Sequence, residues 1–272
     1  MFTRFHHYVV AVSDLEKTAA DYQRIFGVQK PAVHSDARGH REAIVYMGDS
    51  SIHLCQSLTP DGAFAKFIQE RGEGLYSVAL EETDMAAALE RLKRHGVRSI
   101  PTQEPNGVTV HLVHPKATMG LMYELYPRQA GETSPMGTGP VQRIGTVAHG
   151  VKSVDASLVM YEDLFGLKPD SRGVIVRPDA KLRSAWFPVG PGSIEVMEPW
   201  GEGSDATHFL ERRGEGLYCL SMRVKGLGAF VEELKSKGVR LLPGATPQLA
   251  WMHPKETHGM LFEMSDADRR AH

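Results

Sequence analysis

An internal repeat constrains the fold of this chain more than any other feature of its sequence. The run from Glu70 to Tyr76 (ERGEGLY) returns as 212–218 (RRGEGLY), and the run from His114 to Thr118 (HPKAT) returns as 253–257 (HPKET). The offset is 142 residues for the first pair (70 to 212) and 139 for the second (114 to 253), and the order is kept. Ordered matches of this kind rarely arise by chance, so we expect two tandem copies of one folding unit.

The boundaries of the two copies follow from length and composition. A chain of 272 residues is long enough for two domains that each bury a core. The segment 129–142 holds three Gly, two Pro, one Ser and two Thr, a composition typical of a linker. The predicted domains are therefore 1–128 and 143–272, with 129–142 between them.

Each copy is expected to contain a shorter repeat of its own. An apolar run over 5–12 predicts a strand, and the capping-box pattern from Ser13 to Glu16 predicts the start of a helix that ends at Gly27. Two further strands are expected around a tight Gly48-Asp49 turn, and a second round of strand, helix and strands follows. The coarse prediction is a strand–helix–strand–strand–strand module used four times. Its segments are strands at 42–47, 51–56, 75–80, 97–100, 108–113 and 121–126, and helices at 84–95, 154–165 and 227–237.

Charge and composition exclude several classes of partner. The net charge is -2, so no strong field attracts nucleic acid or an anionic membrane. No apolar run reaches the roughly 18–20 residues that span a bilayer, and the first residues lack the pattern of a signal peptide. The only cysteines, Cys55 and Cys219, do not make a disulfide framework. We expect a cytoplasmic protein whose main partner is a small molecule.

Three phrases of the N-terminal copy resemble a known family. They are HYVVAVSDL at 7–15, GEGL at 72–75, and HPK at 114–116 followed by GLMYEL at 120–125. The sequence resembles the vicinal-oxygen-chelate (glyoxalase, bleomycin-resistance, dioxygenase) superfamily, and within it most closely the methylmalonyl-CoA epimerases. The resemblance implies an α+β fold with two tandem glyoxalase-like domains. Each domain would consist of two βαβββ modules that form a curved half-barrel sheet with helices outside.

The resemblance also implies a metal site and a catalytic carboxylate. The family's ligand positions fall on His7, Gln56, Ser77 and Glu124, and the family has a histidine where this chain has Ser77. The implied metal ligands are therefore His7, Gln56 and Glu124. The position of the catalytic carboxylate falls on Glu42, and Glu124 is a second catalytic candidate.

These residue types suit the implied chemistry. Epimerisation next to a thioester needs a base on one face of the carbon and an acid on the other. A divalent ion such as Co, Mn, Zn or Mg would stabilise the developing negative charge as a Lewis acid. The implied activity is that of a metal-assisted isomerase, epimerase or lyase, and the implied substrate class includes acyl-CoA thioesters.

The pattern is broken in two places. A serine hydroxyl such as that of Ser77 is a poor metal ligand. In the second copy the matching positions hold none of the expected histidines, which argues against a two-domain extradiol dioxygenase. The second copy is expected to support the fold, a homodimer interface or part of the pocket. Its matching residues are Thr146, Glu198, Cys219 and Glu263, with Ser184 at the position of Glu42.

The sequence supports two hypotheses about function. The first is the metal-assisted enzyme acting through Glu42 and Glu124. The alternative is a metal-free small-molecule binding protein on the same fold, which Ser77 and the loss of the site residues in the second copy favour. Four aromatic positions near the predicted cups also favour it: Tyr76, Tyr218, Trp186 and Trp251. The sequence also leaves open whether the modules pair within one copy or across the two copies.

Overall fold

The computed structural model contains two eight-stranded sheets with helices packed against them, which confirms the predicted α+β class and the tandem arrangement. Strand order is β2-β3-β4-β1-β5-β8-β7-β6 in the first sheet and β10-β11-β12-β9-β13-β16-β15-β14 in the second. Each sheet therefore uses the strands of one copy, and the two orders are the same. The described residues are 1–35, 39–131, 136–201, 203–244 and 246–266. Residues 132–135 of the predicted linker and 267–272 of the predicted second domain lie outside them.

The N-terminal copy follows the predicted module twice, with one added helix after the first round. The added helix, α2, has no fully buried residue and its N-cap, Gly62, makes no side-chain cap, so neither pattern nor capping signalled it. The elements are β1 (Phe2–Ala11), α1 (Leu15–Phe26), β2 (Val33–Ser35), β3 (His40–Met47), β4 (Ser50–Ser57), α2 (Ala63–Arg71), β5 (Gly74–Glu82), α3 (Met85–Arg94), β6 (Ser99–Gln103), β7 (Thr109–Val113) and β8 (Met122–Pro127).

The C-terminal copy repeats this order element by element. Its first helix continues past Met160 as a single π-helical turn, Tyr161–Phe165, where the sequence predicted one uninterrupted helix. The elements are β9 (Val141–Gly150), α4 (Val154–Met160), β10 (Ile175–Arg177), β11 (Leu182–Val189), β12 (Gly192–Pro199), α5 (Asp205–Arg213), β13 (Gly216–Val224), α6 (Leu227–Ser236), β14 (Leu241–Pro243), β15 (Leu249–Met252) and β16 (Phe262–Ser265).

Helix α1 shows how the sequence sets the ends of an element. The helix is capped by Asp14, whose side chain accepts from the backbone N–H of Lys17, and it ends at Gly27 in the left-handed conformation. The predicted capping box was wrong by one residue, because the Ser13 side chain instead hydrogen-bonds to Glu73. The buried stripe of the helix is Leu15, Thr18, Ala19, Tyr22, Ile25 and Phe26.

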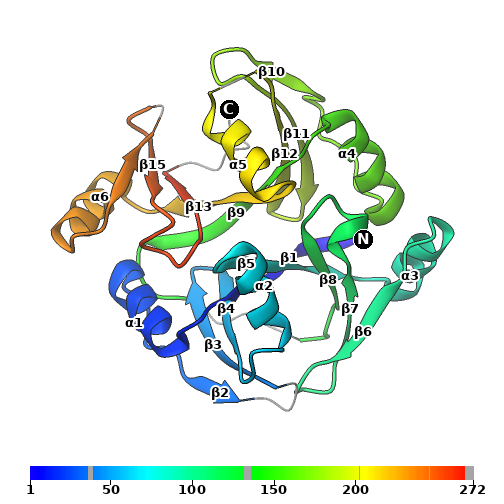
Figure 1. Cartoon of the computed structure of the whole chain (residues 1–272), viewed down its shortest axis with the longest axis horizontal. Helices are drawn as coiled ribbons and strands as arrows, with labels where there is room; N and C mark the ends of the chain where they lie inside the picture. Colours follow the sequence, from blue (N-terminus) through cyan, green and yellow to red (C-terminus); the bar gives the residue numbers. More distant parts are fainter. Residues whose placement is uncertain (36–38, 132–135, 202, 245, 267–272) are drawn as a thin grey trace. The chain divides into compact units, whose positions relative to one another are not determined.

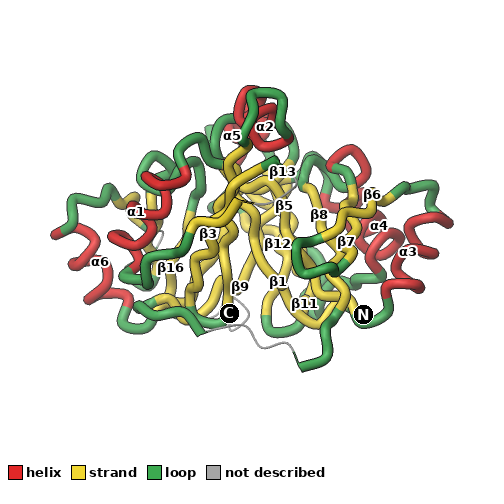
Figure 2. Tube along the Cα trace, turned by 90° about the horizontal axis from the view of Figure 1, so that it is seen from below, coloured by secondary structure: helices red, strands yellow, loops and turns green. Residues whose placement is uncertain are grey.

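The chain divides into two compact units, each drawn from both copies. One unit contains Met1–His6, Ser77–Gly131 and Thr146–Tyr218, and the other contains the remaining segments. In the second unit α1 and α6 lie side by side (Figures 1 and 2), and Arg24 Nη1 donates to Lys237 O at 3.3 Å. Strands thus join within a copy, whereas each compact unit combines segments of both copies. His7 and Gln56 therefore share a unit with Cys219 and Glu263, and Glu124 lies in the other unit. The domain boundaries at 128 and 143 stay a prediction.

None of the helices in the described part of the chain combines the length and the apolar character needed to cross a membrane.

Candidate functional site

The register of three strands brings two of the predicted site residues onto one sheet face. The two-residue Gly48-Asp49 turn pairs Glu42 of β3 with Cys55 of β4, and parallel pairing sets Val9 of β1 beside His53 of β4. Side chains two residues apart on a strand share a face. His7, Glu42 and His53 therefore lie on the same face, and His53 was not selected from the sequence.

These three side chains form a compact cluster. The rings of His7 and His53 stack with centroids 4.0 Å apart and planes 16° apart. His53 Nδ1 lies 2.8 Å from Glu42 Oε1, and because an ionised carboxylate only accepts, the imidazole is the donor. His7 is 5% exposed, and the side chains of His53 and Glu42 are 16% and 20% exposed, so the cluster is shielded from bulk water while remaining reachable.

The cluster keeps Glu42 ionised. Burial by itself raises the pKa of this carboxyl. The hydrogen bond from His53 and the electrostatic effect of the imidazoles of His53, His7 and His40 outweigh burial and lower the pKa from 4.5 to about 2. At neutral pH the side chain is a carboxylate that can accept a proton.

Gln56 does not join this cluster. It pairs with Arg41, so it faces the opposite side of β4 from Glu42 and His53. Its Nε2 donates to Ser13 O and so ties the end of β4 to the start of α1. The residue at the matching place in the second copy, Glu198, does similar work by accepting from the backbone N–H of Val154 at 2.8 Å. In both copies, the side chain at this position ties the end of a strand to the start of the first helix.

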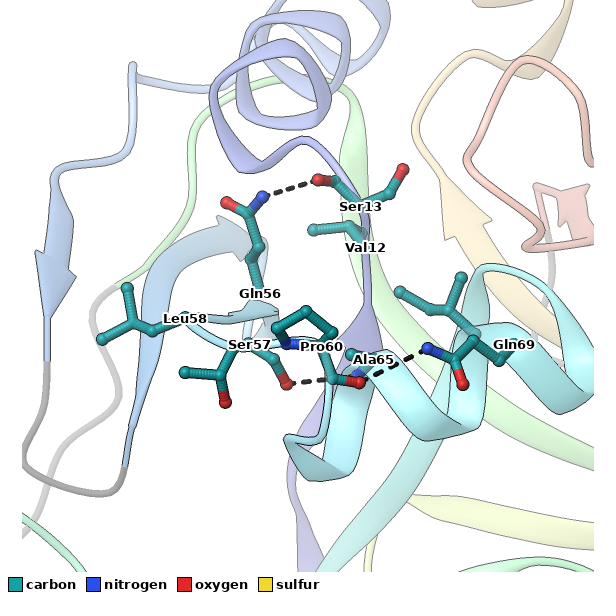
Figure 3. A pocket seen from close by; sticks show the side chains of 10 residues that line it. Val12, Ser13, Gln56, Ser57, Leu58, Pro60, Ala65 and Gln69 are labelled. Carbon is teal, nitrogen blue, oxygen red and sulfur yellow. Dashed lines mark hydrogen bonds between the residues drawn. The ribbon is translucent and has the colours of Figure 1, made fainter.

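Gln56 instead lines a separate pocket of about 370 Å³ between β4, α2 and the end of β1 (Figure 3). The pocket contains neither His7, His53 nor Glu42. We therefore locate the candidate chemistry at the side-chain cluster. The other lining residues are Val12, Ser13, Ser57, Leu58, Thr59, Pro60, Ala65, Ile68 and Gln69.

Glu124 belongs to the other compact unit, together with Ser77. Strands β5 and β8 run parallel, with Ala79 opposite Glu124 and Ser77 opposite Met122. Ser77 is fully buried, and its Oγ donates to Glu124 Oε1 at 2.5 Å. The serine that replaces the expected histidine thus acts as a hydrogen-bond partner of the candidate carboxylate.

The matching face of the second copy carries different chemistry. Thr146 stands at the place of His7, and its Oγ1 lies 3.2 Å from the Oγ of Ser193. Ala148 pairs with Glu195 as Val9 pairs with His53, so a carboxylate occupies the place of the second imidazole. Of the other predicted positions, Ser184 and Cys219 are buried and Glu263 accepts from Ser221 at 3.0 Å.

The His7–His53 pair suits a divalent ion by donor type. Among the described residues, no three His, Cys, Asp or Glu side chains gather as an ion-binding group. Within the pair, however, Glu42 holds Nδ1 of His53 and leaves Nε2 as the nitrogen that would face a ligand, as is usual for metal-ligating imidazoles. Two imidazoles favour Co or Zn over Mg, which prefers oxygen ligands. The residues fit such an ion, with His53 in the role that the sequence gave to Gln56.

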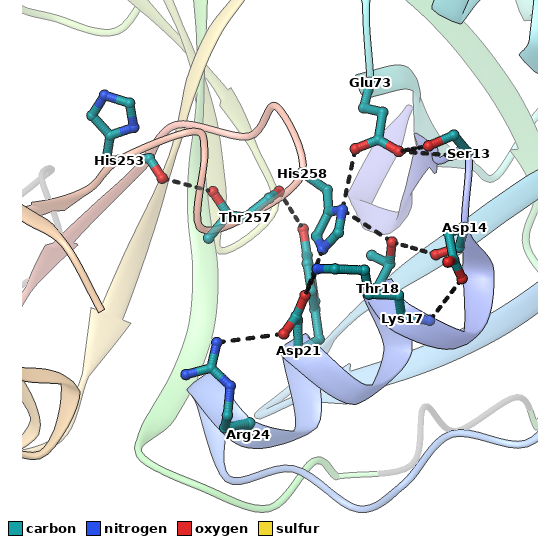
Figure 4. A network of polar contacts seen from close by, with 11 residues as sticks. Ser13, Asp14, Lys17, Thr18, Asp21, Arg24, Glu73, His253, Thr257 and His258 are labelled. Carbon is teal, nitrogen blue, oxygen red and sulfur yellow. Dashed lines mark hydrogen bonds and ion pairs between the residues drawn. The ribbon is translucent and has the colours of Figure 1, made fainter. Parts of the chain in front are cut away.

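A second polar cluster in the same unit joins residues of both copies (Figure 4). His258 Nε2 lies 3.0 Å from Asp21 Oδ2 on α1, and its Nδ1 lies 3.1 Å from both Glu73 Oε2 and Thr18 Oγ1. Burial raises the pKa of Asp21 and Glu73, but hydrogen bonds from Lys17 and His258 to Asp21, and from Ser13 and His258 to Glu73, leave both pKa values below their ordinary values. These hydrogen bonds hold the His258 side chain against α1.

Replacing His258 by Leu should lower the free energy of unfolding at neutral pH. It should also make the free energy of unfolding depend less on pH in the acid range. The depressed carboxyl pKa values give stability that is present above about pH 4 and is lost as the pH falls through the folded pKa values. Without the imidazole both carboxyl groups titrate closer to normal, so less stability is lost in acid. We expect the free energy of unfolding at pH 7 to fall by roughly 1–3 kcal/mol. Urea unfolding at pH 7 and pH 3.5 measures both effects.

His208 provides the matched control for that variant. Its ion pair with Glu211 is more than half exposed on both sides, and such pairs contribute little. His208→Leu should leave stability and its pH dependence unchanged. An equal effect of the two substitutions would show that the buried cluster is not the stabilising feature.

Comparison with known proteins gives consistent results over both copies. Residues 6–113 and 143–270 match two family models described alike as the glyoxalase/bleomycin resistance protein/dioxygenase superfamily. Human mitochondrial methylmalonyl-CoA epimerase is 32% identical over 127 residues, which cover 45% of this chain and 72% of the relative. An ethylmalonyl-CoA/methylmalonyl-CoA epimerase of Cereibacter sphaeroides is 30% identical over 132 residues, covering 46% of this chain and 98% of the relative.

The solved structures add a match over the whole chain. A variant of 4-hydroxymandelate synthase from Streptomyces coelicolor aligns with a TM-score of 0.75, covering 98% of this chain and 94% of its own. Its sequence identity is 17%, so the match shows a shared fold and nothing about the reaction.

Proposed function

Because this chain belongs to the glyoxalase/bleomycin resistance protein/dioxygenase superfamily, we propose that it is an isomerase or epimerase that transfers a proton next to the carbonyl of an acyl-CoA thioester. The observation that carries this proposal is the cluster of Glu42, His53 and His7 on one sheet face. The names of the epimerase relatives support an acyl-CoA as the substrate class. A lyase would begin with the same proton abstraction.

Glu42 is the proposed base. The carbon between a thioester and a carboxylate is acidic because the carbanion delocalises onto the thioester oxygen. The Glu42 carboxylate would take the proton from this carbon, and a proton returned to the opposite face completes the epimerisation. For the second proton transfer the sequence resemblance proposes Glu124, which accepts from Ser77 in the other compact unit.

His53 tunes and orients this base. Its Nδ1–H fixes one oxygen of Glu42 and lowers the carboxyl pKa, so the carboxylate form is ready at neutral pH. The same hydrogen bond weakens the base, since a low pKa reduces the driving force for proton abstraction. The Glu42–His53 pair would therefore act as a unit, with the hydrogen bond loosening as the proton arrives.

His7 and His53 are the residues of this cluster that would hold a divalent ion. Such an ion would supply Lewis-acid stabilisation of negative charge on the thioester oxygen. The side chains themselves position Glu42 and keep the cluster largely shielded from water.

A metal-free binding protein is the second candidate function. The observation that favours it is the hydrogen bond from Ser77 to Glu124, which stands where the family's third imidazole ligand would be. A site of this kind would bind a small molecule without turning it over.

Epimerisation of a single stereoisomer separates the two functions. Protein incubated with Co²⁺ is mixed with one epimer of methylmalonyl-CoA, and the second epimer is followed by chiral chromatography. We expect conversion that stops after EDTA treatment and returns with Co²⁺. Binding of the thioester with no conversion under any metal would favour the binding protein and overturn the proposed activity.

A further inference from the structure

The C-terminal copy carries a polar cluster of its own at the place that matches the candidate active site. Arg177 of β10 donates from Nη2 to Glu195 Oε1 at 2.8 Å and to Ser184 Oγ at 2.9 Å. Glu195 and Ser184 are completely buried. Glu195 matches His53 by register and Ser184 matches Glu42, so the second copy has replaced an imidazole–carboxylate pair with a guanidinium–carboxylate pair.

Trp186 completes this cluster. It pairs with Glu195 across β11 and β12, and Ile175 and Arg177 of β10 lie on the same face because Ile175 pairs with Ser184. The Arg177 guanidinium carbon lies 5.7 Å from the Trp186 ring centroid, and that of Arg172 lies 4.3 Å away. Trp186 is 5% exposed, so this indole is part of a packed polar surface.

Two N–H donors of the cluster have no partner. Arg177 Nε and Trp186 Nε1 are both buried and form no hydrogen bond, although Arg177 makes two through Nη2. A buried donor without an acceptor is unfavourable, and proteins rarely keep two in one cluster unless something else satisfies them. Neither donor can be served by the other, since an indole and a guanidinium have no acceptor.

We propose that the C-terminal copy holds a second small-molecule site, in which Arg177 Nε and Trp186 Nε1 donate to a carbonyl or carboxylate oxygen of the ligand. Glu195 already forms an ion pair with Arg177. The groups that lack a partner are therefore the two N–H donors, and the ligand need not carry a charge. Both a neutral carbonyl and a carboxylate supply the acceptor. This site does not depend on the proposed proton transfer in the N-terminal copy.

The indole N–H of Trp186 reports directly on the proposed contact. The chain has three tryptophans, so ¹⁵N-tryptophan labelling gives three indole signals, and a Trp186→Phe variant assigns the one that matters. Two probes are titrated separately: S-acetyl-N-acetylcysteamine, a neutral thioester, and acetate. We expect the Trp186 signal to shift in a saturable way with at least one probe while those of Trp200 and Trp251 stay in place. The probe that binds tells which acceptor is used.

Arg177→Lys tests the other donor. A lysine keeps a positive charge for Glu195 but has no Nε–H at this place, so probe affinity should fall about tenfold. Arg183→Lys is the control, since Arg183 lies on the neighbouring strand β11, faces the other side of the sheet and pairs with Asp155 and Glu198. A Trp186 signal that neither probe moves, or equal affinity in Arg177→Lys and the wild type, would overturn the second site.

Discussion

Replacing Glu42 by Gln is expected to lower kcat for epimerisation by about 10²- to 10⁴-fold, the usual contribution of a positioned general base. The amide oxygen still accepts from His53 Nδ1, so the cluster and the fold should persist. The amide cannot take a proton from carbon, and this is the property that the substitution removes. Steady-state kinetics with a single epimer of methylmalonyl-CoA measure the loss, and thermal unfolding checks that Tm is unchanged.

Glu16 offers a matched control for that substitution. Its side chain is 60% exposed on α1 and pairs with Arg41, away from the cluster. Glu16→Gln removes the same charge from the same copy and should leave kcat within twofold, an allowance on the order of the roughly 0.5 kcal/mol typical of surface substitutions. If Glu42→Gln also stayed within that range, the base would lie elsewhere.

Replacing His53 by Ala is expected to weaken binding of Co²⁺ by about 100-fold or more, beyond the cost of losing an outer partner of a ligand. It should also raise the pKa of Glu42 from about 2, because burial then acts without the hydrogen bond and the electrostatic effect of His53. Calorimetric titration with Co²⁺ gives the affinity, and a ¹³C-carboxyl titration gives the pKa.

Gln56→Ala is the decisive companion to that variant. The sequence assigned the metal-ligand role to Gln56, whereas the structure turns it away from His53 and toward Ser13. The structure therefore predicts wild-type Co²⁺ affinity for Gln56→Ala together with a small loss of stability from the freed start of α1. Loss of Co²⁺ binding in Gln56→Ala with retention in His53→Ala would restore the original assignment.

The difference between Gln56 and His53 shows what a sequence pattern fixes and what it leaves open. The strands on either side of the Gly48-Asp49 turn were predicted, and a two-residue turn sets the pairing of β3 with β4, so the partner of Glu42 is Cys55. Every second residue from Cys55 shares that face, which includes His53 and excludes Gln56. The sequence assignment followed the end of the strand instead of its register. The length of the Gly48-Asp49 turn would have identified His53 as the residue that shares a face with Glu42.

The strands of the two sheets could be predicted from the sequence because the same strand and helix pattern occurs in both copies. Matching strands of the two copies occupy the same places in both sheet orders. The packing of α1 against α6 was beyond reach, because pairing between distant helices leaves no periodic signal in either one. The polar cluster of the second copy was missed for another reason. Arg177 matches none of the site positions that the first copy indicates, so the repeat gives no signal for it.

Exchange of the α-proton tests the central claim most directly. Methylmalonyl-CoA is incubated in D₂O with Co²⁺-loaded wild-type protein and with Glu42→Gln, and loss of the α-proton signal is followed by NMR. The proposed proton transfer predicts exchange well above the uncatalysed rate in the wild type and its near absence in Glu42→Gln. Exchange at the uncatalysed rate in the wild type, while the thioester is bound, would contradict it.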